Sequence, residues 1–227
     1  MKLCASTYAI FAIAGMAAVA NAATIDLNYT GIVGGNDATR ARIGSSTYLA
    51  GHMTHMIMSG ADAGQSFNTF CIEIAEYATP GTATYEIIDL ADAPNPGSYY
   101  GQARADEVSA ILANALAMGW IDSKMQATSE SASTNRARMG AIQAAIWEAL
   151  GHDFQVNSSS TSSSLRNRYS ELMNENSFDS SLRMHGLRAV VAEGQQDMLY
   201  IVPLPTAGLA GLGMLGLCAG VRATRRR

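Results

Sequence analysis

The sequence has 227 residues, of which 48% are hydrophobic and 15% are charged, and its formal net charge is −4 at pH 7. Five of its fifteen basic residues lie near the two ends of the chain, so residues 23–201 hold ten basic groups against nineteen acidic ones. This excess of acidic groups argues against nucleic acid or anionic lipid as a partner, because both need a basic surface. About 180 residues are enough for one domain with a hydrophobic core.

The N-terminus has the three parts of a secretory signal peptide. Lys2 is followed by an apolar run over residues 8–20 and by the small-residue site Ala20-Asn21-Ala22. An uncleaved anchor or a buried helix would not need this cleavage pattern. We therefore expect residues 1–22 to form a signal helix that a signal peptidase removes.

Strand-like segments dominate the chain up to residue 90. Apolar and polar residues alternate from Ile25, and further strands are expected at about 47–58, 67–74 and 84–90. Clusters of Gly, Asn, Asp and Pro separate these segments and indicate turns.

Helical spacing replaces this alternation in the middle of the chain. Apolar residues at 108, 111, 112, 115 and 116 predict one helix, and a second is expected at about 136–150, before Gly151. A short helix at about 165–174 and strands at 187–192 and 198–202 complete the domain. Strands, then helices, then strands predict an α+β fold in which an antiparallel, sandwich-like β structure over residues 23–201 carries a helical insertion.

The C-terminus has an apolar run flanked by distinctive residues. No charge occurs between Asp197 and Arg222, and the Gly/Ala/Leu-rich segment 206–221 would span about 24 Å as a helix, which flanking arginines could extend by snorkelling. Positive charge after the helix places that end in the cytoplasm. A motif precedes the helix and basic residues follow it: Val202, Pro203, Leu204, Pro205, Arg222, Arg225, Arg226 and Arg227.

This arrangement over residues 202–227 resembles the PEP-CTERM bacterial sorting signals, in their VPLP variant. The resemblance implies a Gram-negative source and a transmembrane helix that tethers the precursor to the inner membrane. It also implies an exosortase-type enzyme that cuts near the motif and passes the protein to the cell surface or the extracellular space.

Residues 23–201 contain a single cysteine, because Cys4 lies in the signal segment and Cys218 in the C-terminal helix. No internal disulfide can form there, so Cys71 is a free thiol, an intermolecular bridge or a residue with special chemistry. Strand alternation places Phe70 and Ile72 on one face and Cys71 on the other, where we expect it to face the helical layer.

A glutamine interrupts the apolar face of the second expected helix. The positions Met139, Ile142, Ile146, Trp147 and Leu150 surround Gln143, whose buried amide would cost about 1–3 kcal/mol without partners. A thiol placed against this amide could displace ammonia and form an internal thioester, provided that the pair is held rigidly and water is excluded.

The segments Phe70-Cys71-Ile72 and Ile142-Gln143-Ala144-Ala145-Ile146-Trp147, with Pro80 between them, resemble the thioester domains of bacterial surface adhesins. The resemblance implies that Cys71 supplies the sulfur and Gln143 the acyl group, with Phe70 and Trp147 of the matching segments in support. It further implies a β-rich fold with a helical subdomain and covalent attachment to a surface target. Glu73 shares the strand face of Cys71 and could assist proton transfer there.

Other interpretations of these residues remain open. Cys71 and Gln143 could be an inert buried pair in a structural envelope or biofilm-matrix protein, and Cys71 could instead form an intermolecular disulfide. Glu73 is otherwise a solvated or salt-bridged carboxylate. His52 and His55 would point to opposite faces of a strand, so no metal site is expected, and a Cys–His hydrolase ranks last. We expect no cofactor and no enzymatic turnover.

Overall fold

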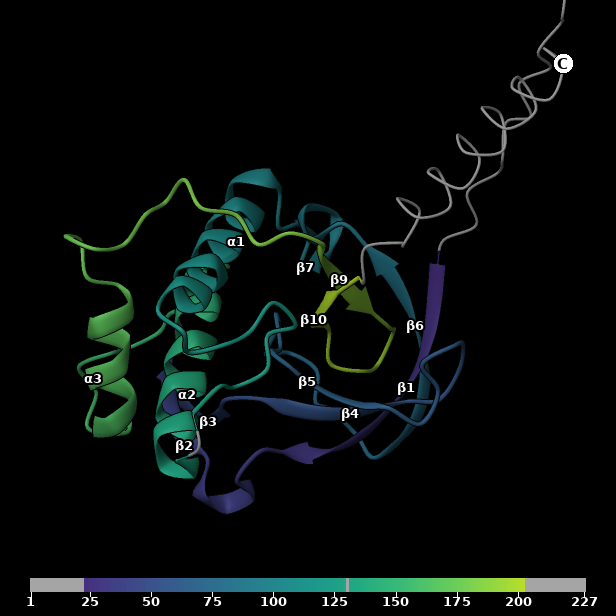
Figure 1. Ribbon diagram of the computed structural model, residues 1–227, viewed down its shortest axis with the longest axis horizontal. Helices are drawn as coiled ribbons and strands as arrows, with labels where there is room; N and C mark the ends of the chain where they lie inside the picture. Colours follow the sequence, from purple (N-terminus) through teal and green to yellow (C-terminus); the bar gives the residue numbers. More distant parts are fainter. Residues whose placement is uncertain (1–22, 130, 203–227) are drawn as a thin grey trace, which may run out of the picture.

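The computed structural model describes residues 23–129 and 131–202, and over these residues the chain is a mixture of strands and helices, as expected. Figure 1 shows the three helices on one side of the molecule and most of the strands on the other. Along the chain, three helices follow the strands of the first half and precede the last hairpin. They are α1 (Gln102–Ala117), α2 (Ala132–Ala149) and α3 (Ser163–Leu172). The expected helical insertion is therefore present.

Six strands form one antiparallel sheet. Its members are β1 (Ala23–Ile32), β4 (Met53–Ile57), β5 (Ser66–Thr69), β6 (Gly81–Ile88), β9 (Leu187–Val191) and β10 (Met198–Ile201), in the order β10-β9-β6-β1-β4-β5. The long strand β1 pairs with β4 on one side and with β6 on the other. The alternation that predicted β1 is visible in its burial, since Ile25 and Leu27 face the core while their neighbours are more exposed.

The sheet curls until its two ends meet. Leu199 N–H donates to Phe70 O at 2.9 Å, Ile72 N–H donates to Asp197 O at 3.0 Å, and Cys71 forms an antiparallel bridge with Met198. The backbone just after β5 therefore pairs with β10, at the opposite edge of the sheet. The antiparallel prediction is confirmed, but a curled single sheet replaces the expected sandwich of two facing sheets, because this closure satisfies the edge strands.

The strand expected at about 47–58 is in fact two strands. Gly51 has φ 147°, and its turn separates β3 (Ser46–Ala50) from β4. β3 pairs instead with β2 (Thr39–Ile43), a strand that the sequence pattern did not predict, and this hairpin packs against α2. Gly140 of α2 allows the close approach, because a Cβ there would lie 1.8 Å from Thr39 Oγ1.

The strand expected at 67–74 is also shorter in the structure. Regular pairing with β4 ends at Thr69, and after the isolated bridge at Cys71 the backbone is irregular. Other elements agree with the predictions to within a few residues, including α2, whose N-cap Ser131 accepts a hydrogen bond from Thr134 N–H. The remaining elements are short: η1 (Gly35–Asp37), η2 (Leu90–Asp92), β7 (Pro94–Asn95) and β8 (Ser98–Tyr99).

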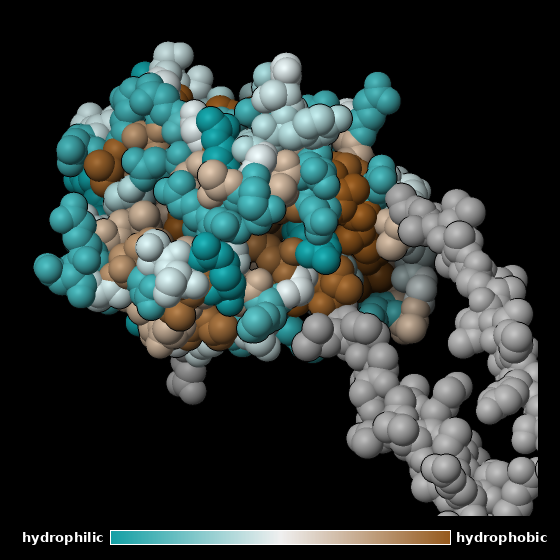
Figure 2. All heavy atoms as spheres, turned by 90° about the horizontal axis from the view of Figure 1, so that it is seen from above, coloured by the Kyte–Doolittle hydropathy of each residue, from teal (hydrophilic) through white to brown (hydrophobic). Residues whose placement is uncertain are grey.

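The buried residues form two adjoining hydrophobic clusters. One joins α1 and α2 to Phe70 and Ile72, and the other joins the interior of the curled sheet to Cys71, Ala144 and Trp147. Side chains on opposite faces of residues 70–72 thus enter different clusters. One surface of the molecule is mainly hydrophilic, with hydrophobic residues in a narrower region (Figure 2).

The expected signal segment, residues 1–22, and the sorting residues from Pro203 onward lie outside the described residues. Among the helices of residues 23–129 and 131–202, none combines the length and the apolar character needed to cross a membrane.

Candidate functional site

Cys71 lies where the curled sheet closes. Its side chain is 3% exposed and packs within the sheet's interior cluster, while its backbone forms the bridge to Met198. Its other neighbour is α2, as expected from the strand alternation. The cysteine therefore sits at a junction that three distant parts of the chain build: the segment after β5, β10 and α2.

The Gln143 side chain is bound to the backbone of Cys71. Cys71 N–H donates to Gln143 Oε1 at 2.9 Å, and Gln143 Nε2–H donates to Cys71 O at 2.8 Å. Gln143 is only 1% exposed, so these two bonds supply the compensation that a buried amide needs. They also fix the carboxamide against the residue that bears the thiol.

Trp147 lies one helical turn beyond Gln143 on the same face of α2. Its indole Nε1–H donates to Cys71 Sγ at 3.1 Å, and the sulfur also contacts Glu73 O at 3.2 Å. A donor aimed at sulfur favours negative charge there. Trp147 can therefore stabilise a thiolate as it forms or as it leaves.

The electrostatics of the thiol depend mainly on its burial. Desolvation raises the pKa of Cys71 far above its usual range, while the Trp147 hydrogen bond acts in the opposite direction. A free thiolate is consequently disfavoured in the resting site. A sulfur that carries a proton or an acyl group has no such charge, so this environment suits a neutral thiol or a thioester.

The hydrogen bond to Gln143 Oε1 has a chemical consequence of its own. Attack on Gln143 Cδ would turn Oε1 into an oxyanion, and Cys71 N–H already points at that oxygen. One backbone donor in this position acts as an oxyanion hole, which is a strong form of transition-state stabilisation. The site thus brings together a thiol, a carboxamide, a backbone N–H donor to the carboxamide oxygen and an indole N–H donor to the sulfur.

A cavity of about 550 Å³ lies over this group. Cys71, Gln143 and Trp147 line it together with three tyrosines, Tyr29, Tyr48 and Tyr77, and with Gln196. Its remaining lining residues are also uncharged: Ile32, Ser46, Thr47, Leu49, Gly51, Met53 and Ala78. A nucleophile that enters this cavity meets a neutral, partly aromatic surface that favours its uncharged form.

The tyrosines and the other lining residues outside the group Cys71, Gln143 and Trp147 were not expected from the sequence. The tyrosines come from β1, from β3 and from the irregular segment after Cys71, and each is unremarkable in its own segment. Only the closure of the sheet and the β2–β3 hairpin bring them together. No local spacing in the chain could have signalled this.

Phe70 does not touch the sulfur. Its ring is fully buried on the opposite side of the backbone, 4.5 Å from the ring of His52, in the helical cluster. It anchors the segment that carries Cys71. The support expected of Phe70 is therefore indirect.

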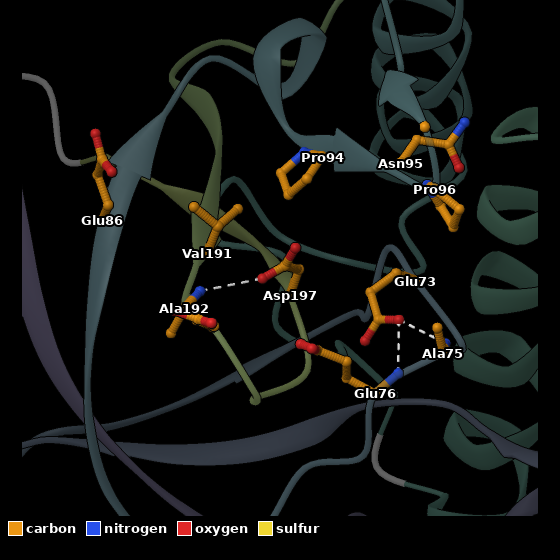
Figure 3. Close-up of a pocket in the computed structure, with 12 residues that line it drawn as sticks. Glu73, Ala75, Glu76, Glu86, Pro94, Asn95, Pro96, Val191, Ala192 and Asp197 are labelled. Carbon is orange, nitrogen blue, oxygen red and sulfur yellow. Dashed lines mark hydrogen bonds between the residues drawn. The ribbon is translucent and has the colours of Figure 1, made fainter.

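The expected position of Glu73 is wrong. Regular strand alternation would have put its carboxylate beside the thiol, but the irregular backbone after Cys71 turns it away. The carboxylate Oε2 accepts hydrogen bonds from Ala75 N–H at 2.5 Å and Glu76 N–H at 2.9 Å (Figure 3). Only the main-chain carbonyl of Glu73 contacts the sulfur.

His52 and His55 pack against aromatic rings and do not line the thioester cavity. His55 lies inside the sheet between Tyr29 and Phe67, while His52, just before β4, lies against Phe70. Among the described residues the hydrogen-bond partners of the Cys71 sulfur are Trp147 and Glu73, and neither is a histidine. In the same part of the chain no three His, Cys, Asp or Glu side chains are arranged to hold a metal ion.

Of the expected sorting residues only Val202 is described, and its N–H donates to Gly186 O at 3.0 Å. Pro203, Leu204, Pro205, Arg222, Arg225, Arg226 and Arg227 lie outside the described residues.

Comparison with known families agrees with this site. A family model described as "TED: Thioester domain" matches residues 68–177, a span that contains Cys71, Gln143 and Trp147. Neither the curated proteins nor the solved structures gave a match to the chain. Over residues 68–177 the chain is therefore similar to thioester domains.

Proposed function

We propose that this protein attaches covalently to a nucleophile on a target through an internal thioester between Cys71 and Gln143. The observation that carries the proposal is the two-point hydrogen bonding of the Gln143 carboxamide to Cys71, with Trp147 on the sulfur. The match to thioester domains supports it.

Bond formation requires one proton transfer and one leaving group. Cys71 Sγ attacks Gln143 Cδ, the C–N bond breaks, and the thiol proton leaves with the nitrogen as ammonia. Cys71 N–H stabilises the oxyanion on Oε1 and Trp147 stabilises charge on sulfur. Because both partners are held in place by the fold, the reaction gains the proximity that intramolecular steps provide.

Attachment to the target is the second acyl transfer. A neutral amine or a hydroxyl enters the cavity and attacks the same carbon, the C–S bond breaks, and the sulfur takes up a proton to become a thiol again. The target is left joined to residue 143 through an amide or an ester. The protein is consumed in this step, so it acts once and is not a turnover enzyme.

We also propose that this attachment takes place outside the cytoplasm. The expected signal segment and the VPLP-type sorting segment support export, tethering at the inner membrane and release or display by an exosortase-type enzyme. The test is to express the full chain in a Gram-negative host and to follow its location with and without Pro203→Ala/Pro205→Ala. Loss of processing in this variant supports the sorting role, and unchanged processing refutes it.

Reaction with an amine probe tests the thioester. The purified protein is incubated with fluorescent cadaverine, denatured and examined on a gel. Labelling that survives denaturation and is absent from the Cys71→Ala variant supports the proposal. Equal labelling of both proteins, or of neither, contradicts it.

One specific observation favours a second candidate, a structural matrix protein without the bond. The two hydrogen bonds between Gln143 and Cys71 already satisfy the buried amide, so the pair is complete without further chemistry. In that case Cys71 would titrate as a free thiol after denaturation.

A further inference from the structure

A second cavity, of about 560 Å³, lies beside the thioester site and is acidic. Its lining includes the acidic residues Glu73, Glu76, Glu86, Glu193 and Asp197, together with the apolar residues Pro94, Pro96 and Val191. None of the described residues that line it is basic. Figure 3 shows Glu73, Glu76 and Asp197 on neighbouring segments around the pocket, with the Asp197 carboxylate turned toward Ala192.

Two of these carboxylates are deeply buried, although acidic side chains are rarely so. Glu73 is 7% exposed and Asp197 is 5% exposed. Glu73 Oε2 and Asp197 Oδ1 accept backbone N–H bonds, but Glu73 Oε1 is buried without a hydrogen-bond partner among the described residues. Among the described residues, the cluster therefore contains one acceptor with no donor and several acidic side chains with no basic residue in the pocket lining.

Desolvation and the neighbouring carboxylates both raise the pKa values of Glu73 and Asp197. Burial, together with Glu73 and Glu76, raises the pKa of Asp197 to about 7, and burial raises the pKa of Glu73. Negative charge is thus costly here unless a cation compensates it.

The chemistry of the pocket distinguishes between kinds of cation. In the described part of the chain, no three acidic, histidine or cysteine side chains converge closely enough to bind one metal ion. A pocket lined by both acidic and apolar residues instead matches a side chain with a methylene stem and a positively charged head. Lysine and arginine have this form.

The same two segments of the chain line the acidic pocket and the thioester cavity. Glu73, Ala75 and Glu76 line the former while Tyr77 and Ala78 line the latter, and Asp197 lines the former while Gln196 lines the latter. Glu73 joins the two sites directly, because its carbonyl contacts Cys71 Sγ at 3.2 Å while its carboxylate lies in the acidic pocket.

We propose that the acidic pocket receives a lysine or arginine side chain of a protein target. Resting on the proposed thioester function, we infer in addition that this contact holds the target's nucleophile over Gln143. The uncharged thioester cavity selects a neutral nucleophile, and the acidic pocket supplies the attraction that this cavity lacks.

The binding step is tested separately from the chemistry. The Cys71→Ala variant, which cannot form a thioester, is labelled with ¹⁵N and titrated with N-acetyl-arginine methylamide, the corresponding lysine derivative, the neutral citrulline derivative and CaCl₂. We expect saturable amide shifts at residues 73–76, 94–97 and 191–197 with one or both cationic derivatives. Neither citrulline nor Ca²⁺ should produce them.

Charge-removing substitutions supply the controls. Glu76→Gln, in which the side-chain oxygen can still accept from Gly194 N–H, and Asp197→Asn should each weaken binding of the cationic derivative at least tenfold. Glu175→Gln, an exposed glutamate outside the pocket, should leave binding unchanged. Saturation by Ca²⁺ alone, equal binding of citrulline, or no shifts with any probe would overturn the proposal.

The second step compares reaction rates in the otherwise unchanged protein. Glu76→Gln should slow the reaction with an Arg- and Lys-containing peptide at least fivefold relative to its reaction with methylamine. Equal slowing of both reactions would refute the positioning role. If intact mass shows no thioester, the covalent function fails, while the binding test in the Cys71→Ala variant still decides the fate of the pocket.

Discussion

The carboxamide of Gln143 spans the main chain of Cys71, with its oxygen 2.9 Å from Cys71 N and its nitrogen 2.8 Å from Cys71 O. A residue of helix α2 thereby mimics a neighbouring strand at the point where the sheet closes. This relationship places the acyl carbon beside the only cysteine of residues 23–201. It also explains how a glutamine can occupy the centre of a buried helical face.

Gln143→Glu should abolish the thioester while nearly preserving side-chain shape. It removes the nitrogen that must leave and replaces the N–H donor to Cys71 O with an acceptor, so we expect a loss of about 2–4 kcal/mol in the free energy of unfolding. Amine labelling and urea unfolding would measure the two effects. A variant with wild-type stability and labelling would show that the amide is not used.

Trp147→Phe tests the hydrogen bond to sulfur. The ring packing is largely kept but the Nε1–H donor is lost, and one hydrogen bond of about 1.4 kcal/mol corresponds to roughly a tenfold slower reaction with methylamine. The change is followed by intact mass against time. Trp120→Phe, a buried tryptophan in the other cluster, is the matched control and should keep the rate. Equal rates in wild type and Trp147→Phe would exclude the role.

His55→Phe should reduce the sensitivity of the fold to acid. Burial lowers the pKa of His55 to about 4, and neither ring nitrogen has a partner among the described residues. The unfolded chain binds a proton near pH 6.5 and the folded chain does not, so the stability that this site contributes falls as pH drops from about 6.5 to about 4.

Phenylalanine removes this titration and fits between Tyr29 and Phe67. Removing two unsatisfied nitrogens should also stabilise the protein by roughly 1 kcal/mol at pH 7. Thermal melts between pH 4 and 7 measure both effects. An identical pH profile in the variant would contradict the assignment.

Gly140→Ala should loosen the hairpin that forms one wall of the thioester cavity. The added Cβ would meet Thr39 Oγ1 at 1.8 Å and Ala50 O at 3.2 Å, so overpacking should cost about 1–3 kcal/mol. Chemical unfolding measures the loss. Adding Thr39→Ala removes the nearer contact and should recover part of it; no recovery would locate the strain elsewhere.

Sequence periodicity predicted the elements whose pattern is local. The alternation around Ile25 and the helical spacing of Gln143 and Trp147 were sufficient to anticipate β1, the buried face of α2 and the meeting of the helix with Cys71. The same reasoning failed where one backbone angle decides the path. The turn at Gly51 divided an expected strand, and the irregular backbone after Cys71 reversed the expected orientation of Glu73.

The closure of the sheet and the two cavities depend on long-range pairing. Residues 70–72 meet β10 across more than a hundred residues of intervening chain, and no spacing within either segment encodes this contact. The tyrosines of one cavity and the carboxylates of the other therefore became visible only in the folded chain.

Intact mass of the purified protein, with Cys71→Ala as control, tests the thioester most directly. We predict a mass about 17 Da below that calculated from the processed sequence, because one ammonia is lost. The deficit should be absent from the control and should convert to an adduct on treatment with methylamine. Full mass together with a titratable Cys71 thiol would contradict the thioester and leave a structural protein as the description of this domain.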